Sequence, residues 1–112
     1  MRDPARRADV GPVVERYLFA KLKAEHATAD GRGEARGQAR TLAAVSGVLA
    51  VVPGEPADAA ALHAWDLSVV LRFADPEAAA SAPTDPAYVA FERYLGSVAQ
   101  VVKAWSFVLH QE

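Results

Sequence analysis

The sequence has 112 residues, a length that suits one domain built around a single core. Its formal net charge of −2 argues against nucleic acid as a partner, and the lack of cysteine excludes thiolate zinc sites, thiol catalysis and disulfides. No apolar run approaches the roughly 18 residues of a membrane span, and no signal peptide is recognisable, so we expect a soluble cytoplasmic protein that does not bind membranes.

The first 23 residues are predicted to form a leader followed by a strand. Residues 1–12 contain two breaks in regular structure, Asp3-Pro4 and Gly11-Pro12, and we expect them to be flexible. Residues 13–23 alternate between two faces, as in a strand. One face carries Tyr17, Phe19 and Lys21, and the other carries Arg16, Leu18, Ala20 and Leu22.

The next segment is predicted to be a loop, a helix and a short strand. Residues 24–33 are rich in glycine and are assigned to the loop. Residues 34–46 are assigned to the helix, which Gly47 would end. Its apolar stripe consists of Ala35, Ala39, Leu42 and Val45. Residues 48–52 form an apolar run closed by Pro53-Gly54, which indicates a second strand, and residues 55–63 form a connection with a helical turn.

Residues 64–73, the third predicted strand, have the clearest alternation in the chain. One face is fully apolar and consists of Trp65, Leu67, Val69, Leu71 and Phe73. The opposite face is mixed and consists of Asp66, Ser68, Val70 and Arg72. This pattern predicts a strand whose second face is covered in part by something other than water. Asp66 on that face is expected to pair with Arg72 or with a residue of a second subunit.

Two Asp-Pro pairs are predicted to open helices, since aspartate suits the N-cap and proline the first helical position. Asp75-Pro76 opens an Ala-rich helical turn, and Asp85-Pro86 opens a longer helix whose end Gly96 would fray. The apolar stripe of the longer helix consists of Tyr88, Phe91, Leu95 and Val98. Residues 101–109 are predicted to be a fourth strand, whose two faces the sequence leaves undetermined, and residues 110–112 a tail.

The predicted order over residues 13–109 is therefore β-α-β-β-α-β. This is the ferredoxin-like α+β arrangement, with a four-stranded antiparallel sheet and both helices on one face. The other face would expose several large apolar side chains: Tyr17, Phe19, Val70, Trp105 and Phe107. A soluble monomer seldom exposes such a patch, so the sequence predicts a homodimer in which two sheets pack face to face.

Several of these stretches together resemble the stress-responsive A/B barrel family, also called Dabb. The segment "VERYLFAKLK" matches the family's first strand, "VVKAWSF" matches its closing strand, and "WDLSVVLRFAD" looks like its aromatic-Asp-alternating strand. The segment "SGVLAVVPGEP" stands where the family commonly has a Pro-Gly-Val opening and a later glycine. The segment "DPAYVAF" resembles the family's His-Pro-x-His-x-x-Phe helix start. The resemblance covers residues 14–107. It implies a dimeric α+β barrel, which in some members has a small-molecule cavity between sheet and helices.

The resemblance also implies a site, although this chain departs from the family pattern there. A plant polyketide cyclase of the family uses a histidine at the second His of the helix-start motif as base, with a tyrosine six residues before it. Tyr88 and Ala82 hold these positions here, and Arg16 holds the position of a second histidine near the start of strand one. The cavity is therefore expected to persist, whereas that catalytic pair is absent.

Arg16 and Tyr88 are the candidate catalytic residues, because the strand face and the helix stripe that carry them must cover each other. We expect both polar tips in one cavity, where Arg16 would anchor a carboxylate or enolate oxygen and Tyr88 would donate a hydrogen bond. The alternatives are an arginine that reaches water or pairs with Asp85 or Glu92, and a core tyrosine whose hydroxyl is satisfied near the helix end. The predicted ligand-binding walls are Leu18, Trp65, Leu67, Val69, Phe91 and Val102.

No cofactor or metal is predicted. His26, His63 and His110 lack ligand spacing and are expected on the surface, and "GRGEARG" lacks the lysine and spacing of a phosphate loop. The leading hypothesis is a homodimer that binds a small, largely apolar organic ligand between sheet and helices, with a polyketide-cyclase-like reaction as its catalytic form. The alternatives are a non-catalytic, stress-associated or ligand-carrying dimer, and a heme-degrading or quinol-forming monooxygenase of the same architecture, which the lack of an axial histidine disfavours.

Overall fold

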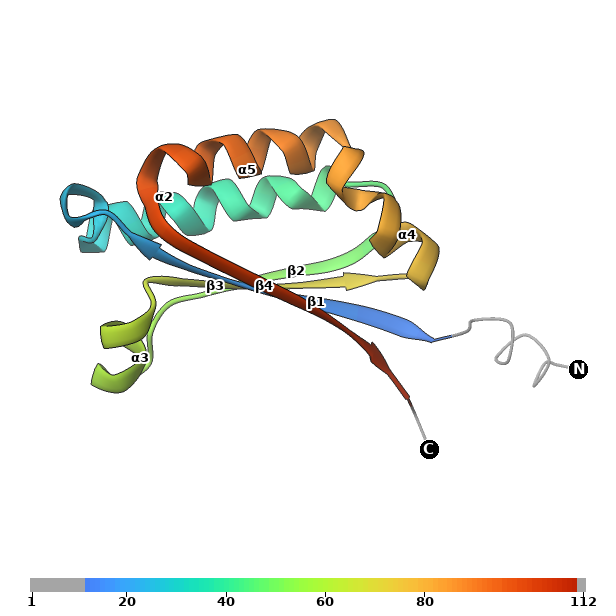
Figure 1. Cartoon of the computed structure of the whole chain (residues 1–112), viewed down its shortest axis with the longest axis horizontal. Helices are drawn as coiled ribbons and strands as arrows, with labels where there is room; N and C mark the ends of the chain where they lie inside the picture. The colour runs from blue at the N-terminus through green and yellow to red at the C-terminus, as the bar shows by residue number, and fades with distance from the viewer. Residues whose placement is uncertain (1–11, 111–112) are drawn as a thin grey trace, which may run out of the picture.

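The structure, a computed structural model, describes residues 12–110. Within this range two long helices cover one face of a four-stranded antiparallel sheet (Figure 1). The strands are β1 (Val13–Leu22), β2 (Val48–Gly54), β3 (Leu67–Phe73) and β4 (Ala99–Leu109). The helices are α2 (Ala29–Arg40), α3 (Ala59–Ala64), α4 (Pro76–Ser81) and α5 (Pro86–Val98), and the 3-10 turns are η1 (Ala24–His26), η2 (Thr41–Ala44) and η3 (Ala82–Thr84).

The sheet has the strand order β2-β3-β1-β4, and all neighbouring strands are antiparallel, which confirms the predicted ferredoxin-like fold. The register assigns the faces of every strand, because directly paired residues point to the same side of a sheet. Tyr17 lies opposite Val70 and Trp105, on the face away from the helices. Arg16 lies opposite Ser106, on the helix side. The faces of β4, undetermined from sequence, follow from this pairing.

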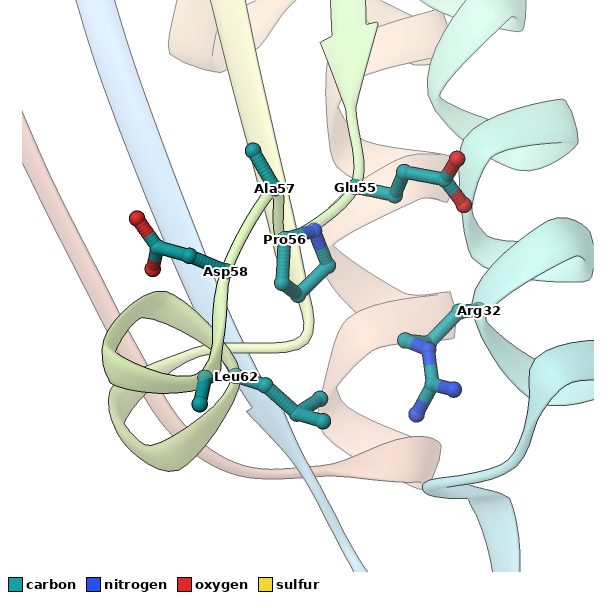
Figure 2. A pocket seen from close by; sticks show the side chains of 7 residues that line it. Arg32, Glu55, Pro56, Ala57, Asp58 and Leu62 are labelled. Carbon is teal, nitrogen blue, oxygen red and sulfur yellow. The ribbon is translucent and has the colours of Figure 1, made fainter.

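Helix α2 begins earlier than predicted, because residues 24–33 form η1 and the first turn of α2 rather than a loop. The Thr28 side chain accepts a 3.0 Å hydrogen bond from the Gly31 nitrogen and caps the helix. Gly31 is also required by a close approach, since a Cβ there would lie 1.8 Å from the His26 carbonyl oxygen. The earlier start places Arg32 on α2, where it faces the connection between β2 and α3 (Figure 2).

Three other boundaries differ from the prediction. β3 begins at Leu67 because α3 and its C-cap occupy the residues before it. α5 continues past Gly96 to Val98, whose side chain is buried in the core, and β4 starts directly afterwards. Pro53-Gly54 belongs to β2, which is an edge strand and therefore tolerates a residue without an N–H group.

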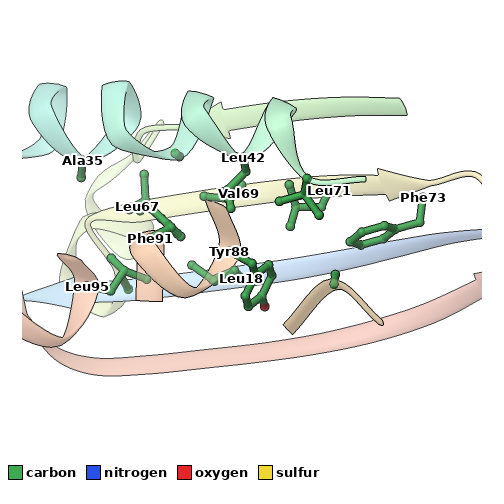
Figure 3. Close-up of a cluster of buried hydrophobic side chains, with 14 of the residues drawn as sticks. Leu18, Ala35, Leu42, Leu67, Val69, Leu71, Phe73, Tyr88, Phe91 and Leu95 are labelled. Atoms are coloured by element: carbon green, nitrogen blue, oxygen red, sulfur yellow. The ribbon is translucent and has the colours of Figure 1, made fainter. Parts of the chain in front are cut away.

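The hydrophobic core fills the space between the sheet and the two long helices (Figure 3). β3 contributes every second residue, and Leu67, Val69, Leu71 and Phe73 are each at most 1% exposed. The other main members are Val14, Leu18 and Ala20 of β1, Ala35 and Ala39 of α2, Leu42 of η2, Val45 just after it, and Tyr88, Phe91 and Leu95 of α5. Both predicted helix stripes are confirmed. The predicted inner face of the third strand is confirmed from Leu67 onward.

We use the name open face for the side of the sheet that α2 and α5 leave uncovered. Trp105 and Phe107 of β4 are 50% and 56% exposed there, and Val52 of β2 is 57% exposed. The aromatic rings contact one another: the ring centroids of Tyr17 and Phe107 are 5.8 Å apart, and those of Phe19 and Trp105 are 6.2 Å apart. The predicted apolar patch is therefore present on the open face.

The predictions for the two ends of the chain remain sequence-based predictions. The expected leader, residues 1–12, and the expected tail, residues 110–112, lie almost wholly outside the described residues. Among the residues that are described, no helix is long and apolar enough to cross a membrane.

Candidate functional site

The structure brings Arg16 and Tyr88 together on the helix side of the sheet. Arg16 comes from β1, and Tyr88 comes from the first turn of α5, which Asp85 caps. The Arg16 Nε donates a 2.8 Å hydrogen bond to the Tyr88 Oη, and the Arg16 Nη1 donates a 3.0 Å hydrogen bond to the Ser106 Oγ on β4. The sequence predicted that the polar tips of Arg16 and Tyr88 would converge, and the structure shows that they are hydrogen-bonded to each other. Their role toward a ligand stays a prediction.

The charge of Arg16 is met only by neutral oxygens among residues 12–110. Tyr88 is 1% exposed, and Arg16 is half-buried beside it. The alternative ion pair with Asp85 or Glu92 does not form, and no other carboxylate in this range lies within ion-pair distance of Arg16. A guanidinium has five N–H donors, and the hydrogen bonds to Tyr88 and Ser106 use two of them. The other three have no hydrogen-bond partner within residues 12–110.

The predicted cavity walls divide into core and surface residues. Leu18, Leu67, Val69 and Phe91 are at most 3% exposed and belong to the close-packed core (Figure 3). Val102 lies on β4 opposite Ala20, on the helix side of the sheet, and is 43% exposed. On the helix side, the accessible surface near Arg16 therefore lies along β4, where Ser106 is exposed, rather than in the depth of the core.

Trp65 lies on the open face, contrary to the prediction that it shares a wall with Leu67. Its ring packs on Phe19, with ring centroids 5.6 Å apart, and Phe19 belongs to the open side of β1. The alternation of the sequence continues through Trp65, but the strand does not, because this residue is the C-cap of α3. A period-two pattern cannot assign a face to a residue outside the strand.

Asp66 is also on the other side from the prediction and pairs with different groups. It is 1% exposed and accepts a 2.8 Å hydrogen bond from the Leu22 nitrogen. Its ion-pair partners are Arg32, at 3.4 Å, and Lys21, at 3.8 Å, rather than Arg72. Asp66 therefore joins the start of β3 to the end of β1 and to α2, which is a structural role.

Arg72 instead takes part in a polar network in the middle of the open face. Its Nε and Nη2 donate hydrogen bonds of 2.9 and 2.6 Å to the Glu15 Oε2, and the Tyr17 Oη donates a 2.6 Å hydrogen bond to the Glu15 Oε1. The bonds from Tyr17 and then Arg72 lower the pKa of Glu15, and the bond to Glu15 raises the pKa of Tyr17. The two charges are paired within one chain, so a second subunit can cover them without supplying a counter-charge.

Ser106 is the functional candidate that sequence reasoning missed. Serine in a strand carries no signal of its own, and its place opposite Arg16 follows only from the register of β1 and β4. The assignment of Arg16 to the helix side would have pointed to Ser106 if the faces of the fourth strand had been known.

Two further pockets are lined by polar residues of the described range. One, of about 340 Å³, lies between Arg32 of α2 and the connection from Glu55 to α3 (Figure 2). The other, of about 420 Å³, lies between the start of α2 and Tyr94 of α5 and includes His26 and Glu34. Burial and, secondly, the Glu34 carboxylate raise the pKa of Tyr94. Within residues 12–110 no cluster of histidine and carboxylate side chains could hold a metal ion.

Comparison with known proteins finds similarity in structure alone, since no family model and no curated protein sequence matches the chain. A Dabb family protein with a ferredoxin-like fold from Mesorhizobium loti superposes with a TM-score of 0.72 at 16% identity, covering 89% of this chain and 99% of the other. The chain has the fold of a Dabb protein. A dimeric ferredoxin-like protein of unknown function from Thermobifida fusca superposes with a TM-score of 0.74 at 17% identity, covering 88% and 92%. A hydroxynitrile lyase from Passiflora edulis gives 0.72 at 8% identity, covering 89% and 95%.

On this Dabb fold, the two positions where the family resemblance implies histidines are occupied by residues that contact each other. Tyr88 and Arg16 hold those positions and share the 2.8 Å hydrogen bond. Ala82, where the resemblance implies a tyrosine, is 2% exposed and packs in the core. At these two positions this chain therefore has a hydrogen-bonded arginine and tyrosine in place of two imidazoles.

Proposed function

We propose that the protein is a Dabb-like homodimer that binds a small, largely apolar organic anion at Arg16. The observation that carries the proposal is the half-buried guanidinium, which two neutral hydroxyls orient and which no carboxylate of residues 12–110 neutralises. A half-buried charge without a counter-charge is costly. A carboxylate or enolate oxygen of a ligand would supply that charge through short, charge-assisted hydrogen bonds.

The apolar part of the ligand has a surface next to this anchor. Val102 and Val108 lie on the same side of β4 as Ser106, opposite Ala20 and Val14 of β1. Both valines are apolar and more than two-fifths exposed. Val108 is two residues from Ser106, whereas Val102 is four residues from it in the other direction. A small ligand whose acidic group binds Arg16 would therefore lay its hydrocarbon part along Val108, which removes apolar surface from water on both sides.

The homodimer is supported by the open face. Its exposed aromatic and aliphatic side chains on β2 and β4 form a patch of the kind that marks an interaction surface. The polar network of Glu15, Tyr17 and Arg72 in its middle is satisfied within one chain. A second copy of the same face therefore meets an apolar surface without unpaired charges, which is what a twofold, self-complementary interface requires.

A polyketide-cyclase-like reaction is the second candidate function. It is favoured by one detail: the Tyr88 Oη accepts the hydrogen bond from the Arg16 Nε, so the phenol keeps its own proton to donate. Arg16 would stabilise an enolate oxygen and Tyr88 would hydrogen-bond to it. The non-catalytic carrier binds the same class of ligand, and only product formation from a polyketide-like acid separates the two.

The experiment is a thermal-shift screen of aromatic acids and polyketide mimics, each paired with its neutral amide. We expect acids to raise the melting temperature of the wild type and amides to have little effect. Arg16→Gln should abolish the response to acids, and Arg93→Gln, which removes the same charge from an exposed position on α5, should retain it. An undiminished response of Arg16→Gln would refute the site.

A further inference from the structure

A separate pocket of about 170 Å³ lies on the open face, where α3 and the connection before it fold against the sheet. Figure 1 shows α3 at the end of the sheet, on the side away from α2 and α5. The pocket is lined mainly by Phe19, Pro56, Ala57, Ala61, Trp65 and Ser68. It lies on the opposite face of the sheet from Arg16 and Tyr88.

Two aromatic rings shape this pocket. Phe19 and Trp65 pack with ring centroids 5.6 Å apart and an interplanar angle of 36°, so they form an angled platform. Aromatic pairs of this kind favour a further flat ring in a stacked or edge-to-face position over an aliphatic group of equal size. Pro56 and Ala61 restrict the remaining space to a small molecule.

One hydroxyl in the wall is left for a ligand. The Ser68 Oγ makes no hydrogen bond with any residue in the range 12–110. A Cβ on Gly54 would lie 2.6 Å from this oxygen, so glycine at this position keeps the space of the hydroxyl clear. Glu55 also contributes to the lining, but its carboxylate is 3.1 Å from the Arg36 guanidinium and is therefore already paired. The other lining residues carry no charge, so the pocket favours a neutral ligand over an ion.

We propose that this pocket binds a small, neutral, planar aromatic molecule with one hydroxyl group, that is, a simple phenol. Its ring would pack on Phe19 and Trp65, and its hydroxyl would hydrogen-bond to the Ser68 Oγ. The ligand class differs from the anion assigned to Arg16, and the two sites lie on opposite faces of the sheet. The proposal does not require the anion site to exist.

The test uses p-cresol as the probe and the indole N–H signals of the two tryptophans in nitrogen-15 NMR spectra. Trp105→Phe identifies the Trp65 signal. We expect p-cresol to shift the Trp65 signal saturably, and 4-methylcyclohexanol, which has the same hydroxyl but no aromatic face, to bind at least several-fold more weakly. Ser68→Ala should weaken p-cresol about fivefold, the value of one neutral hydrogen bond, and leave toluene unchanged.

Ala61→Phe fills the pocket without removing any of its walls, and Ala60→Phe adds the same ring at an exposed neighbouring position of α3. The first variant should abolish the p-cresol shift and the second should preserve it. Equal binding of the cyclohexanol, or binding that survives Ala61→Phe, would overturn the proposal. So would a p-cresol shift that disappears as the protein dimerises with rising concentration, since the pocket would then be filled by the second copy.

Discussion

Val70→Asp tests the proposed dimer at the centre of the open face. Val70 lies between Tyr17 of β1 and Val52 of β2, and it is half-buried within one chain. An aspartate there still reaches water in the monomer, so we expect the variant to fold. In the dimer the facing sheet would exclude that water, and the twofold axis would place two aspartates in one interface.

The magnitude follows from two costs. A buried valine is worth about 2 kcal/mol, and about half of that remains to be gained at the interface because Val70 is already half-buried. Desolvating a carboxylate costs about 2 kcal/mol or more per subunit even after water penetrates. Two subunits together lose about 6 kcal/mol, which corresponds to a dissociation constant raised by about four orders of magnitude.

Sedimentation velocity over a dilution series measures this change, with circular dichroism as the check on folding. Val89→Asp, the same substitution at a 37% exposed position on α5, is the matched control and should leave the dimer intact. If Val70→Asp dimerises as tightly as the wild type, the open face is not the interface and the reasoning is wrong.

Three further predictions concern single side chains, and one concerns the leader. Tyr88→Phe should fold but lose about 1–2 kcal/mol in its free energy of unfolding, measured in urea, because the Arg16 Nε loses its acceptor. Asp66→Ala should cost about 3 kcal/mol in the same assay, because it leaves the buried Leu22 N–H without a partner and breaks a buried ion pair. Since the pKa of Glu15 is lowered in the folded state, its ionised form stabilises the fold at neutral pH, and that contribution is lost as the pH falls through the folded-state pKa. Glu15→Gln should therefore melt below the wild type at pH 7, with a gap that closes in acid; a constant gap would contradict this. Deletion of the leader, residues 1–12, should leave the melting temperature nearly unchanged.

The sequence predicted the fold because its patterns are local. The alternation from Leu67 to Phe73 and the stripe from Tyr88 to Leu95 each identify a buried face without reference to the rest of the chain. Thr28 also carried a usable local signal, since a threonine N-cap marks a helix start, but the glycines after it favoured a loop.

What the sequence could not supply depends on contacts between distant residues. The buried carboxylate of Asp66 is stabilised by a hydrogen bond from the Leu22 nitrogen, 44 positions away in the sequence. Ser106 belongs to the site because β4 pairs with β1 in one register and not in the neighbouring one. Trp65 lies on the open face because it is the C-cap of α3 and not part of β3, a boundary that alternation alone does not reveal.

Native mass spectrometry of the protein as purified tests the proposed dimer and its anion site together, because one spectrum reports both the assembly and the small molecule bound to it. We expect the mass of two chains together with a small acidic molecule, at up to one copy per subunit, and we expect Arg16→Gln to keep the dimer but lose the molecule. A single-chain mass at micromolar concentration, or a bound molecule equally abundant in Arg16→Gln, would contradict this expectation.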